Sequence, residues 1–252
     1  MENIYGLLGK KLSHSFSKKY FTDKFQKLSI NNSQYLNFEI EEINLLKKII
    51  VDYPNIKGLN VTIPYKESVI NLLDELSEEV KIIGAVNTIK ISWLNNKAFL
   101  KGYNTDAYGF AQSIKPFLDY NHQRALILGN GGAAKAVKYV LNNLGIDYIV
   151  ISRNPDRTKN ELAYSDLNEY AINQNKFIIN TTPLGMYPNE NDYPDIPYAG
   201  ISNLHLCVDL IYNPEKTIFL QKSENQGSKI LNGLTMLKMQ AEKAWEIWNS
   251  NL

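Results

Sequence analysis

The most constraining feature of this sequence is a Gly-rich segment that follows a short apolar run near the middle of the chain. Ala125 to Leu128 are apolar, and an Ala-rich stretch with helical spacing follows the glycines. Gly129, Gly131 and Ala134 match the G-x-G-x-x-[G/A] pattern of a strand, a tight turn and a helix. Glycine permits such a turn and lets the backbone approach a pyrophosphate, while the start of the helix favours an anion.

A second apolar run supports a nucleotide-binding role for this segment. Gly145 follows the expected helix, and Tyr148 to Ile151 then has the composition of a strand, which completes a β-α-β unit. A Gly-rich turn can also be a plain connection between a strand and a helix. The β-α-β context favours nucleotide binding over that alternative and predicts a Rossmann-type domain.

Length, charge and cysteine content restrict the class of protein. The chain has 252 residues, enough for one large or two modest domains, and a net charge of +1 without a basic tract or acidic tail, which gives no indication of nucleic-acid or membrane binding. Cys207 is the single cysteine, so no internal disulfide forms and a reducing compartment fits. We expect a cytoplasmic protein, monomeric or homodimeric, that needs no metal because no His/Cys/Asp/Glu set has ligand spacing.

Strand-like and helix-like patterns alternate along the chain, which predicts an α/β protein of two domains. We expect a Rossmann-type NADP-binding domain at 105–232 and an N-terminal α/β substrate-binding and catalytic domain at 1–104 plus 233–252. The final helix should return to the first domain, with Trp245 and Trp248 on one core-facing side. The predicted strands are 4–9, 35–40, 57–61, 85–91, 97–102, 125–128, 148–151, 176–181 and 205–210, and the predicted helices include 17–28, 43–51, 106–118 and 236–248.

Four polar clusters interrupt the apolar pattern at the ends of predicted strands, where open α/β sheets bind ligands. Three of them have a plain structural alternative: Ser17 could cap a helix, Pro64 could end a strand and leave Lys66 solvated, and Asp106 could cap the next helix. The clusters are Gly9 to Ser17, Gly58 to Lys66, Gly84 to Thr88 and Gly102 to Gly109.

Together and in this order, the clusters resemble the motifs of the shikimate dehydrogenase family over nearly the whole chain. The segments that carry the resemblance are Gly9-Lys-Lys-Leu-Ser-His-Ser-Phe-Ser17, Asn60-Val-Thr-Ile-Pro-Tyr-Lys66, Gly84-Ala-Val-Asn-Thr88, Gly102-Tyr-Asn-Thr-Asp-Ala-Tyr-Gly109, Asn180-Thr-Thr-Pro-Leu-Gly-Met186, Asp209-Leu-Ile-Tyr-Asn-Pro214 with Thr217, and Asn232 to Ala241.

The sequence departs from the family's pattern in three places. Lys11 and Lys18 stand where the family usually has proline, and Asn130 replaces the usual alanine in the Gly-rich turn. The chain also ends soon after Trp248, whereas many relatives continue into another helix. We expect these departures to affect turn stiffness, stability or oligomeric contacts rather than the chemistry.

The resemblance implies reversible reduction of 3-dehydroshikimate to shikimate with NADPH, in the shikimate pathway that leads to chorismate and the aromatic amino acids. The substrate is a small ring with hydroxyls and one carboxylate, and a site for it needs many short polar groups because each unpaired buried hydroxyl costs affinity. By the resemblance, Ser15, Ser17 and Tyr212 should hold the carboxylate. The ring hydroxyls should be met by Asn60, Thr62, Asn87, Asp106 and Gln240.

Reduction of a ketone requires a proton for the developing alkoxide, and Lys66, paired with Asp106, is our candidate for the catalytic group. Burial lowers the pKa of a lysine and a nearby carboxylate raises it. Lys66 could transfer the proton itself or polarise the carbonyl beside a water. We interpret His14 as ordering the Ser-rich turn, and His122 and His205 as structural or exposed.

The residues after the second strand of the nucleotide unit predict NADP as the cofactor. Asp147 precedes that strand and therefore lies at the wrong end to bind a ribose hydroxyl. Arg153 and Arg157 follow it and offer guanidinium groups to a 2′-phosphate, although a solvated basic turn is the alternative. The expected cofactor-binding residues are Gly129, Asn130, Gly131, Gly132, Ala133, Ser152, Arg153, Asn154, Arg157, Thr181 and Gly233.

Two other functions compete with this prediction. One is a quinate/shikimate dehydrogenase that accepts a broader range of substrates or uses NAD. The Ser15/Ser17 and Arg153/Arg157 pairs argue against this alternative. The other is a catalytically silent NADP-binding sensor, which would have no need to keep both Lys66 and Asp106.

Overall fold

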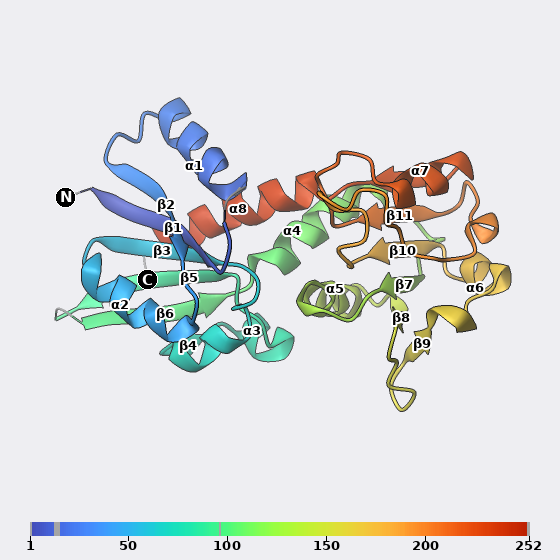
Figure 1. Ribbon diagram of the computed structural model, residues 1–252, viewed down its shortest axis with the longest axis horizontal. Helices are drawn as coiled ribbons and strands as arrows, with labels where there is room; N and C mark the ends of the chain where they lie inside the picture. Colours follow the sequence, from blue (N-terminus) through green and yellow to red (C-terminus); the bar gives the residue numbers. More distant parts are fainter. Residues whose placement is uncertain (1, 13–15, 96, 251–252) are drawn as a thin grey trace. The chain divides into compact units, whose positions relative to one another are not determined.

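The computed structural model describes residues 2–12, 16–95 and 97–250. The chain divides into two compact units, Met1–Thr105 with Ala241–Leu252, and Asp106–Gln240. Each unit contains its own six-stranded sheet with helices (Figure 1). The expected α/β fold class with two domains is confirmed.

The sheet of the first unit is mixed, in the order β2-β1-β3-β5-β6-β4. Its strands are β1 (Asn3–Gly9), β2 (Ser33–Glu39), β3 (Ile56–Val61), β4 (Glu75–Leu76), β5 (Thr88–Leu94) and β6 (Lys97–Tyr103). β1 pairs in parallel with β2 and β3, whereas β5 pairs antiparallel with β3 and β6. The helices are α1 (Phe16–Lys27), α2 (Leu46–Asp52), α3 (Glu78–Ile83) and the C-terminal part of α8 (Leu234–Asn249).

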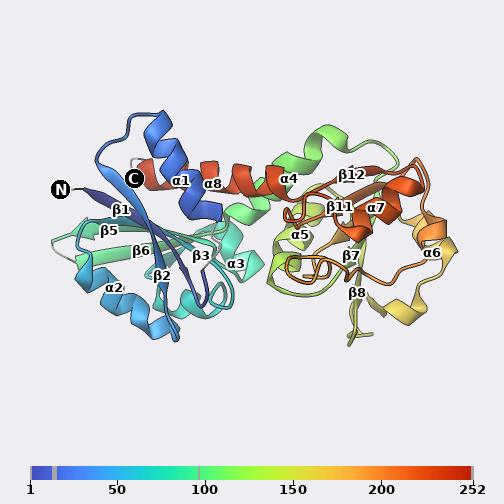
Figure 2. The ribbon, with the colours of Figure 1, turned by 45° about the horizontal axis from the view of Figure 1, so that its top comes forward.

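Alternation along β1 gives this sheet two apolar faces, because successive side chains of a strand point to opposite sides. Tyr5 and Leu7 pack with α1 and α8, whereas Ile4 and Leu8 join the core that includes α2. Figures 1 and 2 show α1 and the end of α8 on one face and α2 on the other. As predicted, the indole rings of Trp245 and Trp248 pack in this core, and the final helix returns to the first unit.

The sheet of the second unit is parallel throughout, in the order β12-β11-β10-β7-β8-β9. Counted from β7, this is the 3-2-1-4-5-6 strand order of the Rossmann fold. The strands are β7 (Arg124–Leu128), β8 (Asp147–Ser152), β9 (Glu161–Ala163), β10 (Phe177–Asn180), β11 (Leu206–Asp209) and β12 (Lys229–Leu231). The helices are α4 (Thr105–Ile114), α5 (Gly132–Asn143), α6 (Glu169–Gln174), α7 (Ile218–Asn225) and the first turns of α8.

The structure corrects several predicted boundaries. The strand expected at 85–91 is β5, which begins at Thr88, because the N–H groups of Val86 and Asn87 bond to the Lys66 and Tyr103 carbonyls. The helix expected at 43–51 begins as a 3-10 turn before α2. None of the helices in the described ranges combines the length and apolar character needed to traverse a lipid bilayer.

Candidate functional site

In the first unit, buried amides and hydroxyls gather where β3 and β5 pair. Asn60 is buried, and its Oδ1 accepts a hydrogen bond from the Tyr35 hydroxyl at 2.8 Å. Its Nδ2 donates to Thr88 Oγ1 at 3.2 Å. The orientation of the Asn60 amide is therefore fixed from both ends.

Asn87 continues the same hydrogen-bonded cluster. Its Oδ1 accepts from the backbone N–H of Thr105 at 2.7 Å, and its Nδ2 donates to Thr105 Oγ1 at 3.0 Å. The hydroxyls of Thr88 and Thr105 lie 3.1 Å apart, which joins Asn60 to Asn87 through buried polar atoms. A connected set of this kind holds polar side chains in one arrangement.

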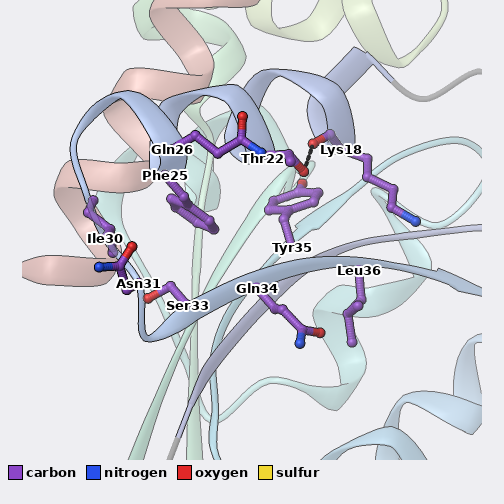
Figure 3. Close-up of a pocket in the computed structure, with 10 residues that line it drawn as sticks. All are labelled: Lys18, Thr22, Phe25, Gln26, Ile30, Asn31, Ser33, Gln34, Tyr35 and Leu36. Atoms are coloured by element: carbon purple, nitrogen blue, oxygen red, sulfur yellow. Dashed lines mark hydrogen bonds between the residues drawn. The ribbon is translucent and has the colours of Figure 1, made fainter.

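Tyr35 also belongs to this cluster, although no motif in the sequence indicated it as a site residue. Its ring stacks on Phe21 with centroids 4.6 Å apart, and its hydroxyl is hydrogen-bonded to Ser17 as well as to Asn60. Burial raises the pKa of Tyr35 far above its ordinary value, so the hydroxyl keeps its proton. Tyr35 also lines a pocket of about 400 Å³ between α1 and β2, with Lys18 and Phe25 among the other lining residues (Figure 3).

Ser17 is buried in the first turn of α1, which begins at Phe16. Because Ser17 lies inside the helix, it is not the helix cap, and that alternative is wrong. Ser15 and His14 lie outside the described residues.

Lys66 and Thr62 lie in the turn that follows β3. The Thr62 N–H donates to the Leu8 carbonyl at 2.9 Å, and the Lys66 carbonyl accepts from the Val86 N–H at 2.7 Å. These bonds attach the turn to the end of β1 on one side and to the segment that carries Asn87 on the other. The Lys66 side chain is half-buried.

In the second unit, α4 and α8 carry two of the predicted residues. Asp106 lies in the first turn of α4, and Gln240 is buried on α8. The helices approach closely at Gly109, where an added Cβ would stand 2.5 Å from the Met236 carbonyl oxygen. Tyr212 follows β11, and burial raises its pKa.

The Gly-rich turn has the geometry that an anion requires. Gly129 has φ +100°, which favours glycine, and Gly131 precedes the first residue of α5 without a side chain that caps the helix. A Cβ on Gly131 or Gly132 would meet nothing within 4 Å, so the space over this backbone is open. The uncapped N–H groups at the start of α5, which include that of Ala133, can therefore reach a phosphate, and the turn fits a dinucleotide.

The residues after β8 also fit a charged ligand. The Ser152 hydroxyl is buried and has no hydrogen-bond partner within the described ranges, a cost that a ligand could relieve. Arg153 and Asn154 are exposed, and Arg157 pairs with Asp166 at 2.9 Å. Asp147 begins β8 and lies at its other end.

Thr181 and Gly233 have structural roles that the sequence did not predict. The Thr181 hydroxyl donates to the Leu128 carbonyl at 2.8 Å, which joins the ends of β10 and β7. A Cβ on Gly233 would stand 2.0 Å from the Leu210 carbonyl oxygen, so only glycine fits against that backbone.

Asp209, at the end of β11, is a buried carboxyl whose role was also missed. It accepts hydrogen bonds from Thr217 at 2.7 Å, the Ile211 N–H at 3.0 Å and Asn180 at 3.1 Å. Burial raises its pKa to about 6, although these bonds oppose the shift. The motif around Asp209 was visible in the sequence, but its hydrogen-bond partners were not.

The remaining histidines and the cysteine are structural. His122 and His205 are buried, and each accepts a backbone N–H at Nδ1, from Asp119 and Ser202 respectively. Cys207 is buried within β11, and burial raises its pKa to about 11. Within the described ranges, no three His, Cys, Asp or Glu side chains are grouped as metal ligands would be.

A parallel sheet in the 3-2-1-4-5-6 order with an uncapped Gly-rich turn places the second unit in the Rossmann class of dinucleotide-binding domains. Residues 7–89 of the first unit match the model of the shikimate dehydrogenase substrate binding domain.

Full-length relatives agree with this match. The NADP(+) shikimate dehydrogenase of Clostridium beijerinckii is 43% identical, with 97% of this chain and 91% of the relative covered. The crystal structure of a chorismate mutase/shikimate 5-dehydrogenase fusion protein from Clostridium acetobutylicum is 38% identical, with a TM-score of 0.85 over 99% of this chain and 92% of that one. A shikimate dehydrogenase in complex with NADP+ is 31% identical, with a TM-score of 0.85 over 98% and 90%. The chain belongs to the shikimate dehydrogenase family.

Proposed function

We propose that this chain catalyses the reversible NADPH-dependent reduction of 3-dehydroshikimate to shikimate. The observation that carries the proposal is the presence, in one chain, of a Gly-rich turn suited to a dinucleotide and a buried amide and hydroxyl cluster within the region that matches the substrate binding domain. NADPH, when bound, supplies the hydride to the ketone carbon. The oxygen of that ketone must then receive a proton from the protein or from water.

We assign this proton step to Lys66, with Asp106 as its catalytic partner. The backbone bonds of Lys66 fix the position of its turn in the first unit, which supports a positioned acid. The Lys66 ammonium either donates the proton directly or polarises the carbonyl beside a water that donates it. Substrate binding is assigned to Ser15, Ser17, Asn60, Thr62, Asn87, Tyr212 and Gln240.

We assign the cofactor to the second unit, with Gly129 to Ala133 at the pyrophosphate and Ser152, Arg153, Asn154 and Arg157 at the 2′-phosphate. Thr181 and Gly233 complete this set. The open backbone at Gly131 and the buried Ser152 hydroxyl support the assignment. We further propose a cytoplasmic enzyme, consistent with a buried free thiol at Cys207, that is monomeric or homodimeric.

The test is the absorbance of NADPH formed from NADP+ and shikimate, with NAD+ and quinate as controls. Rapid reduction in the shikimate and NADP+ pair alone would support the proposal. Comparable rates with quinate or NAD+ would assign the chain to the broader quinate/shikimate dehydrogenases. A folded protein that binds NADPH but reduces nothing would instead be a sensor.

A further inference from the structure

The buried carboxylate of Glu161 joins the two segments that we assign to the cofactor phosphates. Glu161 begins β9 and is only 8% exposed. Its Oε1 accepts from Asn130 Nδ2 at 2.8 Å, within the Gly-rich turn. Its Oε2 accepts from the backbone N–H of Asp156 at 3.0 Å, within the segment after β8. One side chain therefore bonds to both segments at once.

Asn130 is held in the orientation that this bond requires. The Lys138 ammonium, on α5, donates to Asn130 Oδ1 at 2.5 Å, which leaves Nδ2 to donate to Glu161. A primary amide can accept through oxygen and donate through nitrogen, so Asn130 links a cation to an anion. An alanine at this position could make neither bond.

At the other end, Asp156 anchors the turn between Arg153 and Arg157. Its carboxylate accepts from the N–H and hydroxyl of Thr158, at 3.1 and 2.6 Å, and pairs with Lys159 at 2.9 Å. The backbone N–H of Asp156 is bonded to Glu161, and Glu161 is bonded to Asn130. The turn is therefore attached to the Gly-rich turn through these two residues.

We propose that Asn130 and Glu161 form a tether that positions the Gly-rich turn and the Arg153–Arg157 segment for simultaneous binding of the pyrophosphate and the 2′-phosphate of NADP. The inference rests on the proposed function. Glu161 is a positioning residue, because both its carboxylate oxygens accept hydrogen bonds from protein donors. Fixing the two segments in advance reduces the ordering cost of binding a ligand that touches both.

The test compares Glu161→Gln and Asn130→Ala with the unaltered protein. In Glu161→Gln, one acceptor becomes a donor that faces the Asn130 amide or the Asp156 N–H. We expect the Kd for NADPH, measured by fluorescence titration, and the KM for NADP+ to rise about tenfold in each variant, the effect of losing one hydrogen bond to a charged group. In Glu161→Gln, a change outside the assigned substrate and cofactor residues, the kcat and the KM for shikimate should change less than twofold. The KM for NAD+, which lacks the 2′-phosphate, should rise less than that for NADP+.

Two further variants make the test specific. The Kd of the double variant Asn130→Ala/Glu161→Gln for NADPH should be no higher than that of the single variant with the higher Kd. The reason is that the two residues act through the Asn130–Glu161 hydrogen bond. Glu224→Gln is the matched control: it removes the same charge from Glu224 on α7, whose exposed carboxylate pairs with Lys216, and its affinity for NADPH should be unchanged.

The proposed tether would be refuted if either folded single variant bound NADPH with unaltered affinity. It would also be refuted if the losses of affinity in the double variant were additive. Thermal unfolding establishes that each variant is folded, and Asn130→Ala, which removes no charge, carries the test if Glu161→Gln does not fold. The titration uses NADPH alone and therefore does not depend on the proposed reaction. If the protein bound NADPH but did not oxidise shikimate with NADP+, the proposed reaction would be refuted, and the titration would still test the tether.

Discussion

The indole of Trp248 lies directly against the backbone of Gly58: a Cβ added at Gly58 would stand 2.2 Å from Trp248 Cδ1 and Nε1. The indole N–H also donates to the Ile89 carbonyl at 3.0 Å. The helix that ends the chain therefore packs on β3 with no room for a side chain at this position.

Gly58→Ala should destabilise the protein by about 1–3 kcal/mol, the usual range for overpacking a core. The urea midpoint measures this loss. Combining Gly58→Ala with Trp248→Leu should cost less than the two separate changes together, because the smaller side chain relieves the clash. Strict additivity would show that the two residues do not restrict each other.

Lys66→Ala should lower kcat for shikimate oxidation by about 10²–10⁴-fold, the contribution typical of general acid–base catalysis. The KM for shikimate should change much less, because the lost interaction belongs to the chemical step. Lys57→Ala, which removes an exposed lysine of the same unit, is the control and should keep full activity. A Lys66→Ala enzyme with near-normal turnover would remove Lys66 from the chemistry.

Arg153→Ala should raise the KM for NADP+ by roughly 10- to 100-fold, since hydrogen bonds between charged groups contribute about 1.5–3 kcal/mol. The KM for NAD+ should hardly change, so the preference for NADP is largely lost. Arg124→Ala, at the opposite end of the strands, serves as the control. Equal efficiency of the unaltered enzyme with NAD+ and NADP+ would contradict the assignment.

The raised pKa of the Asp209 carboxyl predicts a defined pH dependence of the free energy of unfolding. Burial raises the pKa of this carboxyl to about 6 from its ordinary value of 3.8, so the folded state holds the proton more tightly than the unfolded chain. Its contribution to the free energy of unfolding is fully present below about pH 4. This contribution, roughly 3 kcal/mol in total, is lost as the pH rises through 6. The difference in unfolding free energy between the protein and Asp209→Asn, measured by urea at several pH values, should change across this window. Parallel curves would refute the shift.

Local patterns predicted the fold well because local physics produces it. The Gly-rich turn was predictable since Gly129 needs a positive φ and Gly131 precedes a helix, and both requirements are set by neighbours in sequence. The apolar alternation around Tyr35 likewise identified β2. Strand ends were less predictable, as at β5, because the bonds that fix Asn87 come from the distant residue Tyr103.

The polar partners of the candidate site could not be predicted from the sequence. The Tyr35–Asn60 bond joins residues 25 apart, and the Asn130–Glu161 bond joins residues 31 apart. The sequence around these residues does not indicate which donor will face which acceptor, because the pairing of distant strands and the packing of helices determine it. Short strands such as β9 carry too few residues for a periodic pattern to show.

The packing of Trp248 in the core of the first unit has a consequence for how the chain folds during synthesis. This unit begins at the N-terminus, yet one of its largest core side chains leaves the ribosome about 140 residues after Thr105. At about 5–20 residues per second, that is a delay of roughly 7–30 s. We expect the second unit to reach its protease-resistant form first on the ribosome. Nascent chains arrested with residue 240 outside the ribosome and Trp248 still inside it should therefore expose residues 1–105 to protease, and equal resistance of the two units at that length would exclude this order.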